Sequence, residues 1–178
     1  MKALIVVDYT YDFVIGNLPC GDPAVAIEDR ISELTDQYVN AGDYVVMAVD
    51  IHEEKDPYHP ETKLFPPHNI KGTSGRDLYG KLNEVYERHR NQVYWMDKTR
   101  YSAFCGTDLD IRLRERGITE LHSVGVCTDI CVLHTAIEAY NLGYRIVIHE
   151  DAVASFNQEA HHWALAHMRN TLGAEIVV

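Results

Sequence analysis

Short runs of apolar residues alternate along this chain with stretches in which apolar residues recur every three or four positions. A continuous apolar run is typical of a parallel strand that is covered on both faces, and the helical spacing is typical of an amphipathic helix. The runs predict six strands, at residues 2–7, 44–49, 92–96, 121–126, 144–149 and 175–178. The periodic stretches predict helices at residues 22–41, 76–88, 106–116, 129–142 and 157–172.

Strands that alternate with helices predict a parallel sheet with right-handed crossovers and helices on both faces. We therefore expect the α/β class, as a three-layer α/β/α arrangement around a six-stranded, mainly parallel sheet. The 178 residues are enough for one full core, and the absence of repeats and linkers predicts a single domain over residues 1–178. Residues 9–23 are rich in Gly and Pro and predict a loop. Residues 51–75 also lack a period, and so long a loop in a compact domain is usually functional.

Composition narrows the range of partners. An apolar share of 46% and a charged share of 24% are ordinary for a globular protein, while a net charge of -11 argues against nucleic-acid or anionic membrane partners. The first residues offer too short an apolar run for a signal peptide or a membrane span, so we expect a cytoplasmic protein. Four cysteines without a CxxC pair indicate reduced thiols. We expect a homo-oligomer that acts on a small molecule.

Cys131 is the first candidate for a chemical role, because it lies in the first turn of a predicted helix that follows a buried strand and a tight corner. Unpaired backbone N–H groups and the positive end of the helix dipole favour the thiolate at such a position. A buried, inert thiol is the alternative for any single cysteine. A redox pair with Cys127, four residues earlier, is a further alternative, although CxxC geometry is missing.

Reactive side chains also follow the first three predicted strands: Asp8, Asp50 and Lys98. Ligands of open parallel sheets bind outside the carboxyl ends of the strands. Any one of these residues alone would be read as a solvated strand end, but together with Cys131 they predict an active site at this edge. If the strand order is 3-2-1-4-5-6, Lys98 starts two strands from Asp8, about 10 Å away, and its side chain has to lean across.

Four motifs carry a family resemblance: VVD at the end of the first strand, YDF after it, KTRYSAF after the third strand, and GVCTDICV at the corner. Over nearly its whole length the chain resembles the isochorismatase-like cysteine hydrolases, and within them it is most similar to the nicotinamidases. The resemblance implies the isochorismatase-like hydrolase fold and a catalytic triad of Asp8, Lys98 and Cys131. Asp8 would be the general base, Lys98 would hold it ionised and support the thiolate, and Cys131 would attack the acyl carbon.

The resemblance also implies an unusual corner before the nucleophile. It places a cis peptide bond at Val126–Cys127 and an oxyanion hole in the backbone N–H groups of Cys127 and Cys131. Family members usually have a small residue such as Ala where this chain has Cys127, and that thiol has no role that the resemblance explains.

The long loop supplies a second constellation. Asp50, His52, Glu61 and His68 form a mixed nitrogen and oxygen set that suits one divalent ion, with zinc favoured and manganese or iron as alternatives. His59 competes as a ligand, whereas the resemblance favours Asp50, His52 and His68, with Glu61 bound directly or through water. In the nicotinamidases such an ion binds the pyridine nitrogen, and a solvated acidic loop is the alternative.

By resemblance, Phe13, Phe65 and Tyr101 complete a pocket for a flat, uncharged ring. The predicted activity is the hydrolysis of nicotinamide to nicotinate and ammonia through a Cys131 thioester. Another small-amide hydrolase of the family, with a ureido or other carboxamide substrate, is the alternative within the class. A non-catalytic metal or thiol module is the alternative outside it, and the intact triad argues against that reading.

Overall fold

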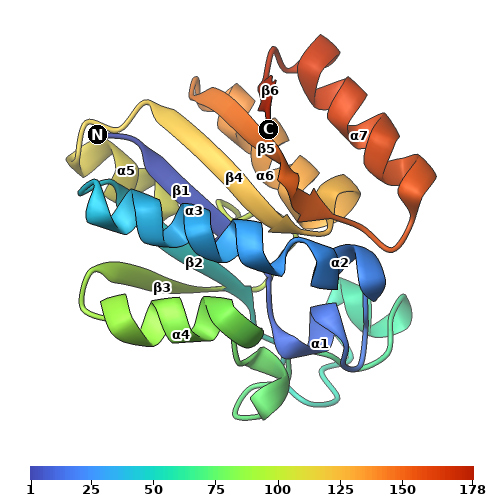
Figure 1. Cartoon of the computed structure of the whole chain (residues 1–178). Coiled ribbons are helices and arrows are strands. Elements are labelled where there is room, and N and C mark those ends of the chain that lie inside the picture. Colours follow the sequence, from blue (N-terminus) through green and yellow to red (C-terminus); the bar gives the residue numbers. More distant parts are fainter.

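The computed structural model describes residues 1–178, and its centre is a six-stranded sheet (Figure 1). The strands are β1 (Ala3–Val7), β2 (Tyr44–Asp50), β3 (Val93–Lys98), β4 (Glu120–Val126), β5 (Arg145–Ala154) and β6 (Glu175–Val177). Their order is β3-β2-β1-β4-β5-β6, and every neighbouring pair is parallel. The predicted α/β class and strand order are confirmed, and the sheet is wholly parallel.

Helices cover both faces of the sheet. On one face lie α1 (Tyr11–Val14), α2 (Asp22–Ala26), α3 (Glu28–Asn40) and α4 (Gly80–His89). On the other lie α5 (Leu109–Glu115), α6 (Leu133–Asn141) and α7 (Gln158–Thr171). No helix combines the length and apolar character that crossing a bilayer requires.

The central strand β1 explains why the apolar runs are continuous. Ala3, Ile5 and Val7 belong to one core cluster, and Leu4 and Val6 belong to the cluster on the opposite face. Since successive side chains of a strand point to opposite faces, a strand covered on both sides must be apolar at every position.

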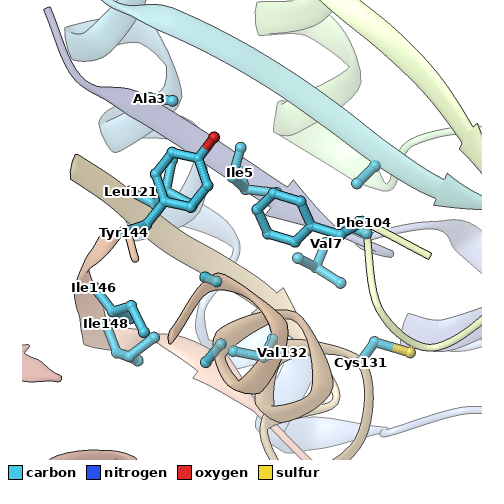
Figure 2. Packing of buried hydrophobic residues seen from close by; sticks show 14 of the residues in the cluster. Ala3, Ile5, Val7, Phe104, Leu121, Cys131, Val132, Tyr144, Ile146 and Ile148 are labelled. Carbon is cyan, nitrogen blue, oxygen red and sulfur yellow. The ribbon is translucent and has the colours of Figure 1, made fainter. Parts of the chain in front are cut away.

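Figure 2 shows the first of these clusters, in which the side chain of Cys131 lies at one end, beyond Val7 and Val132. The opposite end of the same cluster holds Ile146 and Ile148 of β5. The candidate nucleophile is therefore fixed against packed core, not on a loose surface loop.

Gly125 permits a close approach of β4 to β1 just before the corner. A Cβ on this residue would lie 2.0 Å from the carbonyl oxygen of Val7, and its φ of +114° falls in a region that favours glycine. The register between β4 and β5 also shifts between Ser123 and Gly125. A side chain here would push apart the two strands that carry Asp8 and the corner.

Several predicted boundaries were wrong. The predicted loop 9–23 contains α1, which has four residues and is too short for a helical period to show. The predicted helix 22–41 is two helices, because Ile27 leaves helical geometry at φ -92° and ψ 2°. The helix predicted from residue 76 begins at Gly80, after a short 3-10 turn, η2 (Ser74–Arg76).

Two further differences affect the site. The helix predicted over residues 129–142 begins with one π-helical turn, η3 (Thr128–Val132), before α6. Strand β5 runs to Ala154 and not to residue 149, because the polar residues Glu150 and Asp151 hide its continuation in the apolar pattern. The long loop 51–75 contains a short 3-10 turn, η1 (Pro60–Lys63).

Candidate active site

Four reactive side chains meet at the carboxyl ends of the central strands. Asp8 directly follows β1, Asp50 and Lys98 end β2 and β3, and Cys131 lies in η3 after β4. All four are buried, with at most 4% of the surface of any of them exposed. The parallel sheet thus brings together residues that are as much as 123 positions apart in sequence, from Asp8 to Cys131.

Lys98 reaches across the neighbouring strand to pair with two carboxylates. Its Nζ lies 2.5 Å from Asp50 Oδ1 and 2.7 Å from Asp8 Oδ2, and it donates to the carbonyl oxygen of Arg100 at 3.1 Å. Although burial opposes it, the two carboxylates raise the pKa of Lys98 well above its usual value. The side chain therefore bridges the two-strand separation from Asp8 and stays cationic.

Asp8 is poised to accept a proton. Burial and the nearby Asp50 carboxylate raise the pKa of Asp8 to about 6, against the opposing effect of Lys98. Asp8 Oδ1 accepts the backbone N–H of Asp50 at 2.8 Å, which fixes the carboxylate, and its backbone has a φ of +51°. Ligating atoms of Asp8, Asp50 and Cys131 lie within 4.8 Å of one another, so the carboxylate and the thiol are neighbours, and proton transfer requires only that they approach to hydrogen-bonding distance.

The surroundings of Cys131 favour its protonated thiol. Burial raises its pKa well above the usual value, and the charge of Lys98 only partly offsets this effect. A helix start on its own favours the thiolate, but burial outweighs that effect at Cys131. The strand–helix pattern of the sequence does not reveal how deeply the residue is buried. A neutral thiol beside a carboxylate is the arrangement in which a general base is needed.

Hydrogen bonds hold the turn that contains Cys131 against the loop that follows β3. Thr135 Oγ1 donates to the carbonyl oxygen of Cys131 at 2.7 Å and accepts the N–H of Ala103 at 3.0 Å. Next to this bond, Ser102 Oγ donates to the carboxylate of Glu138. One residue of α6 thus fixes Cys131 and the KTRYSAF loop relative to each other.

The corner before Cys131 has the backbone that the resemblance implied. The Val126–Cys127 peptide bond is cis. Thr128 follows it and is fully buried, with its Oγ1 2.8 Å from His161 Nδ1 of α7. The corner is therefore held by β4 on one side and by α7 on the other.

A second cluster, formed by Asp50, His52, Glu61 and His68, lies beside the triad. One ligating atom from each lies within 4.8 Å of the others, and all four residues are buried. His52 Nε2 is 3.6 Å from Asp50 Oδ2, and His68 Nε2 is 3.4 Å from Glu61 Oε2. These are the residues predicted from the sequence, and the fold brings all of them together.

The atoms that face one another in this cluster have no hydrogen-bond partner. Asp50 Oδ2, His52 Nε2 and His68 Nε2 are all buried without one, which would be costly in a closed core. His68 Nδ1 is 2.8 Å from the carbonyl oxygen of Pro66, which makes it the donor and leaves a lone pair on Nε2. Two imidazoles and two carboxylates with free lone pairs fit a divalent metal ion.

His59 does not join the ligand set. Its Nε2 donates to the carbonyl oxygen of Thr99 at 2.7 Å, and its Nδ1 accepts the N–H of Glu61 at 3.3 Å. Its ring centroid lies 4.4 Å from that of His52. With both ring nitrogens occupied, His59 positions Glu61 and supports His52, which removes it as a competing ligand.

Asp50 belongs to both constellations. Its Oδ1 lies 2.5 Å from Lys98 Nζ, and its Oδ2 faces His52 in the ligand cluster. Although burial opposes it, Lys98 lowers the pKa of Asp50, which keeps both oxygens anionic. Sequence patterning placed Asp50 at the active-site edge and among the candidate ligands, but it did not identify Asp50 as a partner of Lys98, because a contact between neighbouring strands leaves no trace in local spacing.

The three predicted aromatic residues line one narrow slot. Phe13, Phe65 and Tyr101 surround it together with Glu61, Cys127 and Cys131. Its free volume is about 10 Å³, roughly the space of one water molecule. A ring-sized ligand therefore requires side chains at the slot to move, and Phe65, which is only half-buried, is placed to do so.

Sequence reasoning missed three residues of this slot: Leu18, Ile130 and Phe156. Phe156 is 48% exposed and follows the true end of β5. Since the strand was predicted to stop at residue 149, Phe156 was not recognised as a strand-end residue. Recognising β5 through Glu150 and Asp151 would have found it.

A buried Asp–Lys–Cys set beside a four-residue ligand cluster, at the carboxyl ends of a parallel sheet and next to a slot, is an arrangement that can support hydrolysis. The family model of the isochorismatase domain matches residues 2–177, and the chain belongs to this family.

Close relatives cover the whole chain. The isochorismatase family protein PncA of Bacillus subtilis (strain 168) is 63% identical over 179 residues, which is 98% of each chain. The crystal structure of nicotinamidase/pyrazinamidase PncA from Bacillus subtilis superposes with a TM-score of 0.98, 59% identity and 100% of both chains covered. The pyrazinamidase of Pyrococcus horikoshii in complex with zinc has a TM-score of 0.87 and 30% identity, with 99% of this chain and 98% of that chain covered.

Proposed function

We propose that this protein is a nicotinamidase, which hydrolyses nicotinamide to nicotinate and ammonia. The observation that carries the proposal is the link between two groups of residues beside one slot. Asp50 belongs to the four-residue ligand cluster and pairs with Lys98 of the Asp8–Lys98–Cys131 set, and one member of each group, Glu61 and Cys131, lines the slot. The names of the Bacillus subtilis and Pyrococcus horikoshii proteins support the same activity. A homo-oligomer in the cytoplasm stays a prediction.

The residues of the triad account for both half-reactions. Asp8 takes the proton of the Cys131 thiol as its sulfur attacks the carboxamide carbon, and it returns that proton to the departing ammonia. The product of this half is a thioester on Cys131. A water molecule then attacks the thioester with Asp8 as its base, and nicotinate leaves as the thiol is restored. Lys98 stays cationic throughout and stabilises the anionic carboxylate and sulfur.

The backbone N–H groups of Cys127 and Cys131 would stabilise the oxyanion of each tetrahedral intermediate. Both residues line the slot, so this corner adjoins the place where a carboxamide would meet the Cys131 sulfur. Preorganised donors of this kind are typically worth about 10²-fold or more in rate each.

Asp50, His52 and His68, with Glu61, would hold one divalent metal ion, for which zinc is favoured and manganese or iron are alternatives. When bound, the ion supplies a Lewis acid to the nitrogen of the pyridine ring. The rings of Phe13 and Phe65 lie near His68, with centroids 5.1 Å and 6.2 Å from its own. These aromatic faces, with Tyr101, would orient the substrate ring between the cluster and Cys131.

Ammonia release tests the proposal when nicotinamide is compared with benzamide, which has the same carboxamide but no ring nitrogen. We expect turnover of nicotinamide and at least about 10²-fold weaker turnover of benzamide, because the ligand cluster then has no ring nitrogen to engage. Cys131→Ala should abolish turnover of both. Chelation should abolish nicotinamide turnover, and added zinc should restore it.

The outcomes separate the alternatives. Equal rates with the two amides would rule out recognition of the ring nitrogen. No ammonia from nicotinamide, but release from a ureido or other carboxamide substrate, would assign the chain to a different amidase of the family. No reaction with any amide, while zinc still binds, would indicate a non-catalytic module.

A further inference from the structure

Two buried thiols that the proposed reaction does not use lie against each other beside the slot. Cys20 Sγ and Cys127 Sγ are 3.1 Å apart, although 107 positions separate them in sequence. Both are buried, at 5% and 4% exposure, and all four cysteines of the chain are free thiols. The sequence suggested Cys131 as the redox partner of Cys127, whereas the sulfur in contact with Cys127 is that of Cys20.

The distance between the sulfur atoms makes bond formation a small movement. A disulfide has an S–S length of about 2.05 Å, so from 3.1 Å the two atoms need to approach by about 1 Å. Cys20 lies between α1 and α2, in a segment whose neighbours Asn17 and Pro19 are exposed. Such a connection can shift by this amount without disturbing a strand. Its N–H bond to the carbonyl oxygen of Phe13, at 2.8 Å, keeps Cys20 aimed at the corner.

A small oxidant can reach the pair through the slot. Cys127 is one of the residues that line it, next to Cys131, and the free space there is about 10 Å³. A peroxide is close to water in size and is far smaller than an aromatic amide, so it needs less opening than the proposed substrate does. Cys20 lies behind Cys127 and does not line the slot. This order of access makes Cys127 the thiol that meets the oxidant and Cys20 the one that resolves it.

We propose that Cys20 and Cys127 form a covalent modification site, a reversible dithiol–disulfide pair that takes hydrogen peroxide as its two-electron oxidant. The sulfur of Cys127, after loss of its proton, attacks one peroxide oxygen; an S–O bond forms, the O–O bond breaks, and hydroxide leaves to become water. The sulfur of Cys20 then attacks that of Cys127; the S–S bond forms, the S–O bond breaks, and a second water leaves. Two thiols are oxidised, and one peroxide is reduced to two waters.

The disulfide would tie together two walls of the slot. Leu18 precedes Cys20 by two residues and lines one wall, while Ile130 follows Cys127 by three residues and lines another. The reduced pair leaves these walls free to separate when a ring enters, and the oxidised pair holds them together. This consequence follows from the thiol geometry and does not depend on which amide the protein hydrolyses.

The rate of oxidation should be slow near neutral pH. The contact with Cys20 and burial raise the pKa of the Cys127 thiol well above its usual value, and the Cys131 and Asp129 side chains add to this effect. The reactive thiolate is therefore scarce, and the peroxide treatment is best carried out for hours at pH 9.

Mass spectrometry of the full-length Cys131→Ala protein tests the pair without oxidation of the nucleophile. After peroxide treatment, we expect a digest to yield one linked peptide pair that contains Cys20 and Cys127 and is about 2 Da lighter than the two thiol peptides together. Dithiothreitol should restore the separate peptides. Cys20→Ser in the same background is the matched control and should yield no linked pair.

The same peptide mapping on wild-type protein gives a result that does not depend on how the variants fold. Oxidation of the exposed Cys105 provides the internal sign that the peroxide has acted. Oxidised Cys105 with unlinked Cys20 and Cys127 would overturn the proposal. A linked pair of Cys127 and Cys131, or an undiminished yield of linked peptides in Cys20→Ser, would overturn it as well.

Discussion

Replacement of Lys98 by Met is expected to lower the stability of the fold far more than the loss of an equally short ion pair at the surface. Lys98 lies 2.5 Å from Asp50 and 2.7 Å from Asp8, and none of the three side chains has more than 1% of its surface exposed. Met keeps most of the volume of the side chain but leaves two buried carboxylates without their cation. Breaking a buried pair in this way typically costs about 3–5 kcal/mol.

The surface provides a matched control. Lys81 Nζ also lies 2.5 Å from a carboxylate, that of Asp29, but these side chains are 59% and 71% exposed. An exposed ion pair contributes about 0–1 kcal/mol, because water and salt screen it. Lys81→Met should therefore change stability little, even though the distance between the charges is the same.

A second substitution tests whether the charge is responsible. In Lys98→Met/Asp8→Asn, one of the two uncompensated carboxylates is gone, so the double variant should be less destabilised than the sum of the single variants by about 1–3 kcal/mol. The measurement is urea unfolding of metal-free protein at pH 8, followed by circular dichroism. A loss below about 1 kcal/mol in Lys98→Met, or strict additivity, would refute the idea that Lys98 compensates both carboxylates.

Three further predictions concern other parts of the molecule. Burial and the neighbouring His122 lower the pKa of His149 from 6.5 to about 4. Between these pH values the unfolded chain binds a proton that the folded chain does not, so stability should fall as pH drops from about 6.5 toward 4, by at most ~2 kcal/mol at pH 5. Urea unfolding of His149→Phe should show a correspondingly shallower fall. His59→Ala should weaken zinc binding about 10–100-fold in a chelator competition. His59→Asn should retain more affinity because it keeps a side-chain acceptor for the N–H of Glu61, and equal losses in the two variants would contradict the capping role. Gly75→Ala would place a Cβ 2.1 Å from Asp12 Oδ2 and should cost about 1–3 kcal/mol in thermal unfolding, whereas an unchanged melting temperature would show that the Asp12 side chain can move away.

The architecture could be predicted because parallel strands buried on both faces are apolar at every position. The runs that begin at Ala3 and Tyr44 needed no tertiary information. The same rule failed for β5, since Glu150 and Asp151 interrupt the run while the backbone continues as strand. That one error also hid Phe156, which lies beyond the true strand end.

The location of the site followed from strand ends, but its electrostatics did not. That Asp8, Asp50 and Lys98 end or follow strands is visible in the sequence, so their meeting was predictable. The depth of burial, which raises the pKa of Asp8 to about 6 and raises that of the Cys131 thiol, depends on how both faces of the sheet are covered. No local pattern encodes that depth.

The shared carboxylate of Asp50 determines how the two constellations can be separated by experiment. Its Oδ1 pairs with Lys98, while its Oδ2 faces His52 without a hydrogen-bond partner. A substitution at Asp50 removes a proposed metal ligand and a counter-ion of Lys98 at once, so lost activity in such a variant cannot be attributed to the metal alone. His52 and His68 have no contact with Lys98 among its ion pairs and hydrogen bonds, so their replacement by Ala should lower metal affinity while the stability contributed by Lys98 is retained. Metal affinity and stability measured in these variants and in Lys98→Met therefore distinguish the role of the cluster from that of the triad. Asp50 variants alone would mix the two effects.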